Sequence, residues 1–357
     1  MSIVTAPAVN AKCRAMHSRL LGNADYDALL RRPGVPQIAE YLKKETPYAH
    51  VLSRLNENDV HRGQLERLFM RSLFHDYEKL LGFSGGSSGG GGSKEAIRAM
   101  FEEHEVSDLK LVISSICSDH ENLLTAGDLY YVSQYSSFGA DALLEAATME
   151  QLVENLKGTR YHDVLLPFAA AGKPDFFKID CALDLLSHRA KLAAFGKRLK
   201  GSAREACMDI YGQQVDIANI QTIYRMKKLF NYPSATTIAG LIPYRHRLGG
   251  RDLVAMADSG SVGALVEVVS RTWYRPMFPP GEESSWETLH AERFYRMHHA
   301  NMRRHGSDAT TALSYLHMKE VEIKNIIMIL EGVRYSLPTR QIRSFLVGGR
   351  AAHGDQQ

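Results

Sequence analysis

Apolar residues recur at intervals of three and four along most of the chain, which is the spacing of one face of an α-helix. One example is the series Ile217, Ile220 and Ile223, and another is the segment from about Ala309 to Glu331. Runs that alternate apolar and polar residues between turn dipeptides, as strands do, are scarce. The pattern therefore predicts an all-α protein.

Glycine and proline indicate where several helices end. We expect Gly332 to end the long helix that begins near Ala309, and Pro338 to open a short helix that continues through Leu346. Earlier in the chain, helices are predicted over residues 64–81 and 95–103.

The run between those two early helices, residues 84–93, consists of glycine and serine alone. Such a sequence has no side chain to pack, so it is expected to behave as a flexible coil. Its glycines do not form a nucleotide-binding loop, because Lys94 follows Ser93 and no strand precedes the run.

A Thr-x-Tyr triplet occurs three times at equal intervals. Its tyrosines, Tyr48, Tyr161 and Tyr274, are 113 residues apart at each step. A similar short amphipathic segment precedes each triplet, over residues 36–44, 149–157 and 261–271. One matched spacing could arise by chance, but the matched flanks indicate an internal repeat.

A second element also occurs three times, downstream of each triplet. It begins at an acidic residue in each copy, namely Asp108, Asp216 and Glu322. Asn219 and Asn325 follow three residues later in the second and third copies. Two elements in the same order predict three similar helical modules over 1–128, 129–240 and 241–347, followed by a polar tail over 348–357.

The repeated residues admit a structural and a functional interpretation. We expect each tyrosine to be a packing anchor whose hydroxyl bonds to the backbone. The acidic and asparagine side chains lie among isoleucines, so they are expected to be buried and hydrogen-bonded. A fixed contact between helices is favoured over a polar binding site, because a catalytic site rarely needs to occur three times in one chain.

Composition narrows the class of protein. The chain has 357 residues, is 45% hydrophobic and 23% charged, and carries a net charge of +3. These are ordinary values for a soluble globular protein and do not suggest a dedicated nucleic-acid binder. The four cysteines are far apart, as expected for reduced thiols. No leader sequence is evident and no run of 18 apolar residues occurs, so no transmembrane segment is expected.

A basic stretch runs from Arg293 to His305 and includes Arg296, Arg303 and Arg304. It is predicted to be a solvated basic helix. The four arginines are candidate contacts with a partner, for which an acidic protein surface or lipid headgroups are favoured over a metal. Its residues His298 and His305 lie two turns apart, too far to share one metal ion.

Known catalytic patterns are absent from the sequence. No nucleophile elbow, zinc-binding His pair or dinucleotide fingerprint occurs. The adjacent carboxylates at 102–103 and 282–283 would point about 100° apart on a helix, which is unsuited to shared acid–base work. We therefore expect no catalytic residue, cofactor or metal site.

Several segments resemble a known family. Residues 216–225 are similar to its Asp-x-x-Asn helix, and residues 312–326 to its Tyr-Leu-x-x-Lys-Glu-x-Glu-Ile-x-Asn helix. Residues 337–347 resemble its closing segment. The family is the C subunit of prokaryotic V/A-type ATPases, which is called the d subunit in the eukaryotic vacuolar enzyme. The resemblance covers roughly residues 10–347, and the glycine and serine run departs from it.

The resemblance implies a funnel of three helical modules around a pseudo-threefold axis. It also implies a non-catalytic socket on the cytoplasmic face of the membrane, coupling the central stalk to the membrane rotor ring during ATP-driven proton or sodium transport or ATP synthesis. Its partners would be central-stalk subunits and the ring, and the isolated chain would be a monomer.

Three other classes of function remain. A helical-repeat adaptor that binds other proteins is the first alternative, although solenoid units usually have about 20–45 residues. A nucleic-acid-binding helical protein would need a larger excess of positive charge on one face. An enzyme is least favoured, because no catalytic constellation is found.

Overall fold

The structure is a computed structural model. It describes residues 8–53, 62–84, 91–118, 124–125, 128–129, 134–169, 175–230, 232–304 and 306–348. Within these ranges the chain forms sixteen α-helices and no strand, which confirms the predicted all-α class. No helix in the described ranges is long and apolar enough to cross a membrane.

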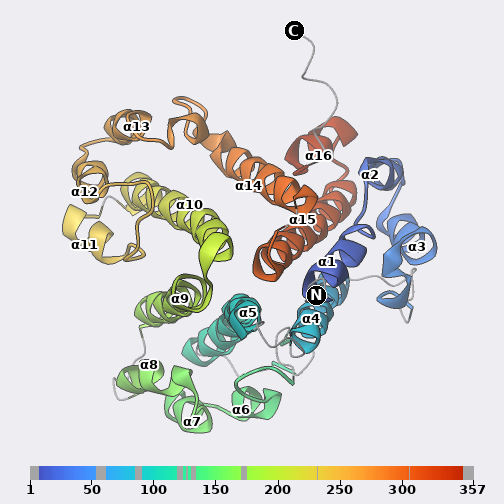
Figure 1. Ribbon diagram of the computed structural model, residues 1–357, viewed down its shortest axis with the longest axis horizontal. Helices are drawn as coiled ribbons and strands as arrows, with labels where there is room; N and C mark the ends of the chain where they lie inside the picture. The colour runs from blue at the N-terminus through green and yellow to red at the C-terminus, as the bar shows by residue number, and fades with distance from the viewer. Residues whose placement is uncertain are drawn as a thin grey trace, which may run out of the picture. The chain divides into compact units, whose positions relative to one another are not determined.

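Three α-helices are much longer than most of the others and follow one another at wide intervals in the chain (Figure 1). They are α5 (Gly91–Cys117), α10 (Gly201–Arg225) and α15 (Asp308–Arg334). The remaining α-helices are α1 (Ala8–His17), α2 (Asn23–Leu30), α3 (Val35–Glu45), α4 (Arg62–Phe83), α6 (Ala140–Leu144), α7 (Met149–Asn155), α8 (Arg160–Ala169), α9 (Phe176–Ala193), α11 (Ser234–Ala239), α12 (Gly250–Asp258), α13 (Val262–Ser270), α14 (Trp286–Arg303) and α16 (Thr339–Phe345).

Short helical turns of other kinds extend or connect these helices. Two are π-helices, at the end of α9 and at the end of α10, and three are 3₁₀-helices. They are η1 (Pro47–His50), η2 (Ala194–Arg198), η3 (Met226–Phe230), η4 (Arg275–Met277) and η5 (Glu283–Ser285).

Serine hydroxyls cap the first turns of α13 and α15. Ser307 accepts a hydrogen bond from the backbone N–H of Thr310 at the start of α15, at 3.2 Å. Ser261 does the same for Ala264 at the start of α13, at 3.1 Å. Each bond satisfies one of the backbone donors that a helix leaves unpaired in its first turn.

The end of α15 differs from the prediction. The helix continues past Gly332 to Arg334, and Ser336 takes the left-handed conformation that closes it, with φ of 54°. The backbone N–H of Leu337 bonds to the carbonyl of Gly332 at 2.8 Å, which is a Schellman cap. Gly332 is instead a point of close packing, since a Cβ there would lie 2.5 Å from Ile342 of α16.

The run of glycine and serine departs from the predicted coil at its C-terminal end. Helix α4 ends at Phe83, and helix α5 begins at Gly91, so residues 91–93 are helical. The prediction was therefore wrong for those three residues, which form the first turn of α5. Residues 85–90 lie outside the described part of the chain.

The chain divides into two compact units. One comprises Met1–Ala194 with Tyr295–Gln357, and the other comprises Phe195–Phe294. The first unit joins the two ends of the chain, since α1 packs against α15 and α2 also contacts α15. The predicted module boundaries do not coincide with these units and remain a prediction.

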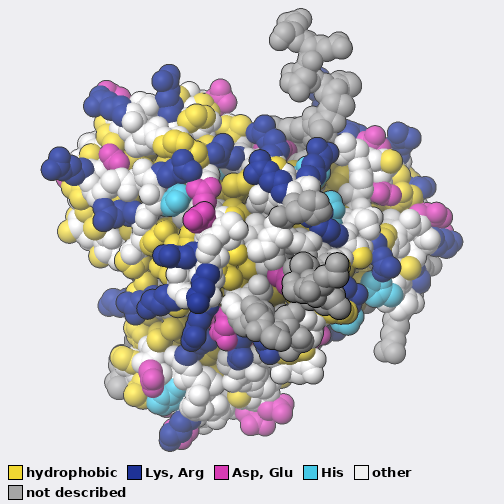
Figure 2. Space-filling view, in the orientation of Figure 1, with side chains coloured by type: hydrophobic (Ala, Val, Ile, Leu, Met, Phe, Trp, Pro, Cys, Tyr) yellow, Lys and Arg dark blue, Asp and Glu magenta, His cyan; other side chains and the backbone are white. Residues whose placement is uncertain are grey.

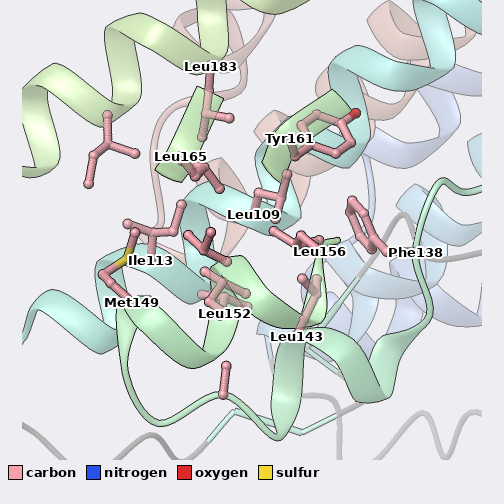
Figure 3. Close-up of a cluster of buried hydrophobic side chains, with 14 of the residues drawn as sticks. Leu109, Ile113, Phe138, Leu143, Met149, Leu152, Leu156, Tyr161, Leu165 and Leu183 are labelled. Atoms are coloured by element: carbon pink, nitrogen blue, oxygen red, sulfur yellow. The ribbon is translucent and has the colours of Figure 1, made fainter. Parts of the chain in front are cut away.

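A set of short helices packs on each of the three long helices. In the first unit, α6, α7 and α8 enclose an apolar cluster with α5 and α9 (Figure 3). Leu109 and Ile113 of α5 face Leu152 and Leu165 of the short helices there, and all four are 0% exposed. Burial of these side chains is the main favourable term that holds the short helices on α5.

The same arrangement recurs around the other two long helices. Helices α2 and α3 contact α15, and helices α12 and α13 contact α10. Each set of short helices therefore packs on the long helix that precedes it, and the set nearest the N-terminus packs on the last long helix.

Candidate functional site

The threonine of each Thr-x-Tyr triplet links the end of one helix to the tyrosine. In all three copies its hydroxyl accepts a hydrogen bond from the tyrosine N–H at 3.2 Å. The same hydroxyl donates to a carbonyl at the C-terminal end of the preceding helix, on Leu42, Leu156 or Val269. This pair of hydrogen bonds explains why the triplet begins with threonine, and it fixes the direction in which the tyrosine points.

The tyrosine of each triplet donates its hydroxyl proton to a buried carboxylate on a long helix. Tyr48 bonds to Glu322 of α15, Tyr161 bonds to Glu105 of α5, and Tyr274 bonds to Asp216 of α10, each at 2.7 Å. The sequence-based expectation of a backbone partner for these hydroxyls was wrong. The partners are side chains because each short-helix set packs on a long helix that carries an acid.

The three contacts follow a cyclic order along the chain. Tyr161 and Tyr274 reach back 56 and 58 residues to their carboxylates. Tyr48 has no long helix of this kind before it and bonds instead to Glu322, 274 residues later. The first tyrosine thus completes the set by joining the N-terminal part of the chain to its C-terminal part.

The register of the first copy differs from the prediction by one helical turn. Glu105, not Asp108, occupies the place of Asp216 and Glu322. Asp108 is buried at 1% exposure and is the counterpart of Asn219 and Asn325, three residues after the acid. Aligning the copies on an acid followed three residues later by Asp or Asn would have found Glu105.

In the second unit, the Asp216 carboxylate accepts several hydrogen bonds. Besides Tyr274, it accepts the backbone N–H groups of His246 at 3.1 Å, Arg247 at 2.7 Å and Leu248 at 3.1 Å. Asn219, on the same face of α10, accepts from the N–H of Ile242 at 2.9 Å and donates to its carbonyl at 3.1 Å. Together the two side chains hold the segment from 242 to 248 against α10.

Glu322 and Asn325 hold other segments in the same way. Glu322 accepts the backbone N–H of Leu21, and Lys319 donates to Glu322 at 2.8 Å and to the Tyr48 hydroxyl at 2.7 Å. Asn325 accepts from the N–H of Val347 at 3.0 Å and donates to its carbonyl at 2.8 Å. The carboxylate therefore anchors the N-terminal segment, and the asparagine anchors the C-terminal one.

Electrostatics favour the neutral form of the three tyrosines. Burial first, and then the adjacent carboxylate, raises the pKa of Tyr48, Tyr161 and Tyr274 above the ordinary value. Each hydroxyl therefore keeps its proton and donates it to the acid. Because Tyr48, Glu322 and Asp216 are at most 3% exposed, they present no surface to a substrate. The geometry suits a permanent contact between helices.

The middle residue of each triplet is exposed and differs in its contacts. Pro47 opens a 3₁₀-turn. Arg160 forms a bidentate pair with the buried Glu102, at 2.6 and 2.5 Å. Trp273 has the guanidinium carbons of Arg247 and Arg293 at 4.2 and 4.8 Å from its ring centroid. The three copies thus share a buried tyrosine but present different chemistry at the surface.

The described part of the basic stretch, residues 293–304, forms the second half of α14 up to Arg303 and is only partly solvated. Arg296, Arg303 and Arg304 are exposed. Arg293 is half-buried and donates to Gln213 at 3.4 Å, next to Trp273. His298 is 0% exposed and bonds to Ser314 at 3.1 Å, which corrects the prediction of a fully solvated helix. His305 lies outside the described residues.

Burial also sets the charge of the histidines on this helix. Burial, followed by the nearby His317, lowers the pKa of His298 well below its ordinary value. The ring centroids of the two histidines are 4.2 Å apart. His298 is therefore a neutral core residue of α14 and α15. No cluster of three or more potential metal ligands is found among the described residues.

Comparison with known proteins identifies the family. Residues 9–345 match the family described as ATP synthase (C/AC39) subunit. The chain is 23% identical over 355 residues to the C subunit of the A-type ATP synthase of Halorubrum lacusprofundi, covering 95% of this chain and 96% of that protein. The corresponding protein of Archaeoglobus fulgidus is 22% identical over 341 residues, covering 94% of both.

A third relative matches over a shorter region. The C subunit of the A-type ATP synthase of Methanosarcina mazei is 25% identical over 223 residues, which is 61% of this chain and 57% of that protein. The match to the family spans nearly the whole chain, including all three triplets and all three long helices. The chain therefore belongs to the ATP synthase (C/AC39) subunit family, the family of V/A-type C subunits, as a non-catalytic member of the complex.

Proposed function

We propose that this chain is a stiff socket in the central rotor of a V/A-type rotary ATPase. It would couple the central stalk to the membrane rotor ring, on the cytoplasmic face of the membrane, during ATP-driven ion transport or ATP synthesis. The observation that carries the proposal is the Tyr–carboxylate contact, made three times in cyclic order by Tyr48, Tyr161 and Tyr274. A cyclic set of equivalent contacts is what a closed ring of three units requires.

The proposal includes a pseudo-threefold, funnel-like arrangement of the three repeated groups. Its support is local, because each group has a long helix, a set of short helices and the same hydrogen bonds. Two sets pack on the preceding long helix, and the first set packs on α15. The bond from Tyr48 to Glu322 is the one that an open row of repeats would lack. An open solenoid leaves its terminal units unpaired.

Transmission of torque needs stiffness, and the repeated contacts supply it. Each carboxylate fixes a tyrosine and, through backbone N–H groups, also fixes a neighbouring segment. Buried hydrogen-bonded networks of this kind allow few alternative packings. The interior of close-packed helices also resists deformation. A non-catalytic coupling part needs these properties and no reactive group.

The exposed arginines of α14 are proposed to face the central stalk. Arg296 and Arg303 are seven residues apart, so they lie on one side of the helix, and Arg304 follows immediately. Arg293 is assigned a different role, because it packs beside Trp273 within the protein. The partners would be central-stalk subunits and the ring, not nucleic acid, and the isolated chain would be a monomer.

Affinity purification of the tagged chain from its native membranes tests this function. The wild-type chain is expected to bring down both the ring protein and the stalk proteins. The triple variant R296E/R303E/R304E is expected to retain the ring and lose the stalk by at least about tenfold, because reversal of three exposed charges replaces attraction by repulsion. Recovery of neither partner by the wild-type chain would contradict the proposed function.

The control is a charge reversal on a surface outside α14. Arg271 is exposed and pairs with Glu267 on the preceding turn, so R271E reverses a surface charge without touching α14. It is expected to leave recovery of both partners unchanged. Equal loss of the stalk in both variants would show that net charge, not the arginine surface of α14, governs the contact.

A further inference from the structure

One part of the second unit has an unusual charge pattern. From residue 217 to residue 251 the chain contains no aspartate or glutamate but six arginines and lysines. They are Arg225, Lys227, Lys228, Arg245, Arg247 and Arg251. The chain as a whole carries a net charge of only +3, so this segment is far more basic than the rest. Such a segment attracts a negatively charged partner.

The same segment exposes four large apolar side chains between residues 229 and 238. Leu229 is 65% exposed, Phe230 59%, Tyr232 43% and Ile238 38%. The rings of Phe230 and Tyr232 stack with their centroids 5.5 Å apart. We call Leu229, Phe230, Tyr232 and Ile238 the apolar patch. On the face shown in Figure 2, apolar and basic side chains adjoin one another in the region of α10 and α11, and acidic side chains also lie over α10.

Basic side chains border the apolar patch and are held in place. The Lys228 ammonium lies 5.1 Å from the centroid of the Tyr224 ring and donates to the Tyr224 hydroxyl at 2.7 Å. Tyr224 in turn packs against Trp286, with centroids 4.9 Å apart. Arg225 is exposed one turn away. The π-helix η3 (Met226–Phe230) that follows α10 places Leu229 and Phe230 at the surface.

This combination fits the interfacial region of a lipid bilayer. Aromatic and aliphatic side chains favour the boundary between headgroups and acyl chains, and lysine and arginine favour anionic headgroups. A protein partner would be expected to take its anchors into packed, desolvated pockets. Here the apolar side chains are instead highly exposed, at 38–65%. The segment from 217 to 251 contributes no acidic side chain that would repel an anionic surface, and an acid from outside it, Glu283, acts electrostatically on Lys228.

We propose that the apolar patch and its bordering residues Arg225 and Lys228 bind the surface of an anionic lipid bilayer. The apolar side chains enter the headgroup boundary, and the two basic side chains contact lipid phosphates. This binding is a property of the chain by itself and does not require the stalk or the ring.

Co-sedimentation of the purified full-length chain with vesicles tests the proposal. The chain is expected to bind phosphatidylcholine vesicles that contain phosphatidylglycerol, and to bind pure phosphatidylcholine much more weakly. Added salt should weaken the binding, because it screens the attraction between the basic side chains and the lipid. Absence of binding to the anionic vesicles would overturn the proposal.

Two variants separate the apolar and the electrostatic contributions. L229S/F230S should lower the affinity for anionic vesicles at least about tenfold, the effect expected from losing one buried apolar side chain or more. R225E/K228E should lower it to a similar extent and abolish the preference for phosphatidylglycerol. The changed side chains lie at the surface, so helix content and the unfolding midpoint should stay at wild-type values.

Leu166 of α8 provides the matched control. It is 50% exposed and lies in the other unit, so L166S removes a comparably exposed leucine without touching the patch. It should bind vesicles as the wild type does. If both patch variants bind vesicles normally but recover less stalk or ring from membranes, the patch is a protein contact and the lipid proposal is wrong. If they lose vesicle binding and recover both partners, it stands independently of the stalk-and-ring role.

Discussion

Replacement of Asp216 by alanine is expected to lower the free energy of unfolding by about 3–5 kcal/mol. Its carboxylate accepts three backbone N–H groups, from His246, Arg247 and Leu248, and the hydroxyl of Tyr274. Alanine would leave these donors without their acceptor and would create a cavity at a 0% exposed position. Denaturant unfolding of the isolated chain measures the loss.

Two further variants on this unit are expected to lose less stability than D216A. Y274F removes one hydrogen bond to a charged group and leaves the backbone bonds intact, so it should cost about 1.5–3 kcal/mol. Glu205 is exposed on the same helix, and E205A should change stability by less than about 0.5 kcal/mol. A loss below about 1 kcal/mol for D216A would mean that the carboxylate does not organise this unit.

The second large effect is expected where the two ends of the chain meet. E322A should cost about 3–5 kcal/mol, because it leaves the Lys319 ammonium buried without its carboxylate. The Lys319 side chain is 11% exposed and that of Glu322 is 3% exposed. K319M should cost less, because Tyr48 and the backbone N–H of Leu21 still donate to Glu322. The double variant E322A/K319M should be more stable than the sum of both losses by about 1–3 kcal/mol.

An exposed pair in the same unit is the control for this cycle. Glu40 and Lys44 are 2.6 Å apart on α3, and their side chains are 52% and 64% exposed. The same substitutions there should show a coupling of no more than about 0.5 kcal/mol, since solvent screens the pair. Additive losses at positions 319 and 322 would argue against a buried network that joins the two ends.

The helices follow from local patterns, so the sequence alone predicts them well. The apolar repeat of α15 and the proline before α16 give those helices nearly their observed bounds. The sequence does not predict the end of α15 correctly, because Gly332 is needed for close packing against Ile342 and not to end the helix. No local pattern reveals such a long-range contact. Similarly, residues 91–93 have poor helix propensity, but the helix that follows them extends over them.

The repeated residues were predictable, but their partners were not. Equal spacing reveals Tyr48, Tyr161 and Tyr274 without any structure. Their bonds to Glu322, Glu105 and Asp216 span 274, 56 and 58 residues, and only tertiary packing determines them. The burial of His298 was missed for the same reason. A histidine among arginines in the sequence is expected to be solvated. In the structure, His298 is covered by α15 and bonds to Ser314 of that helix.

The difference between the three triplets has a structural basis. The tyrosines all make the same buried bond, whereas the exposed Pro47, Arg160 and Trp273 have unlike neighbours. A central stalk without threefold symmetry would meet three similar but unequal surfaces. The shared geometry would then maintain the socket, and the differing positions would allow unequal contacts.

Imaging of the intact complex extracted from its native membrane tests the central claim most directly. The proposed function predicts that the chain lies on the rotation axis between the ring and the central stalk. It also predicts that α5, α10 and α15 are related by an approximate threefold rotation. A position at the periphery of the complex, or three long helices without that relation, would contradict it.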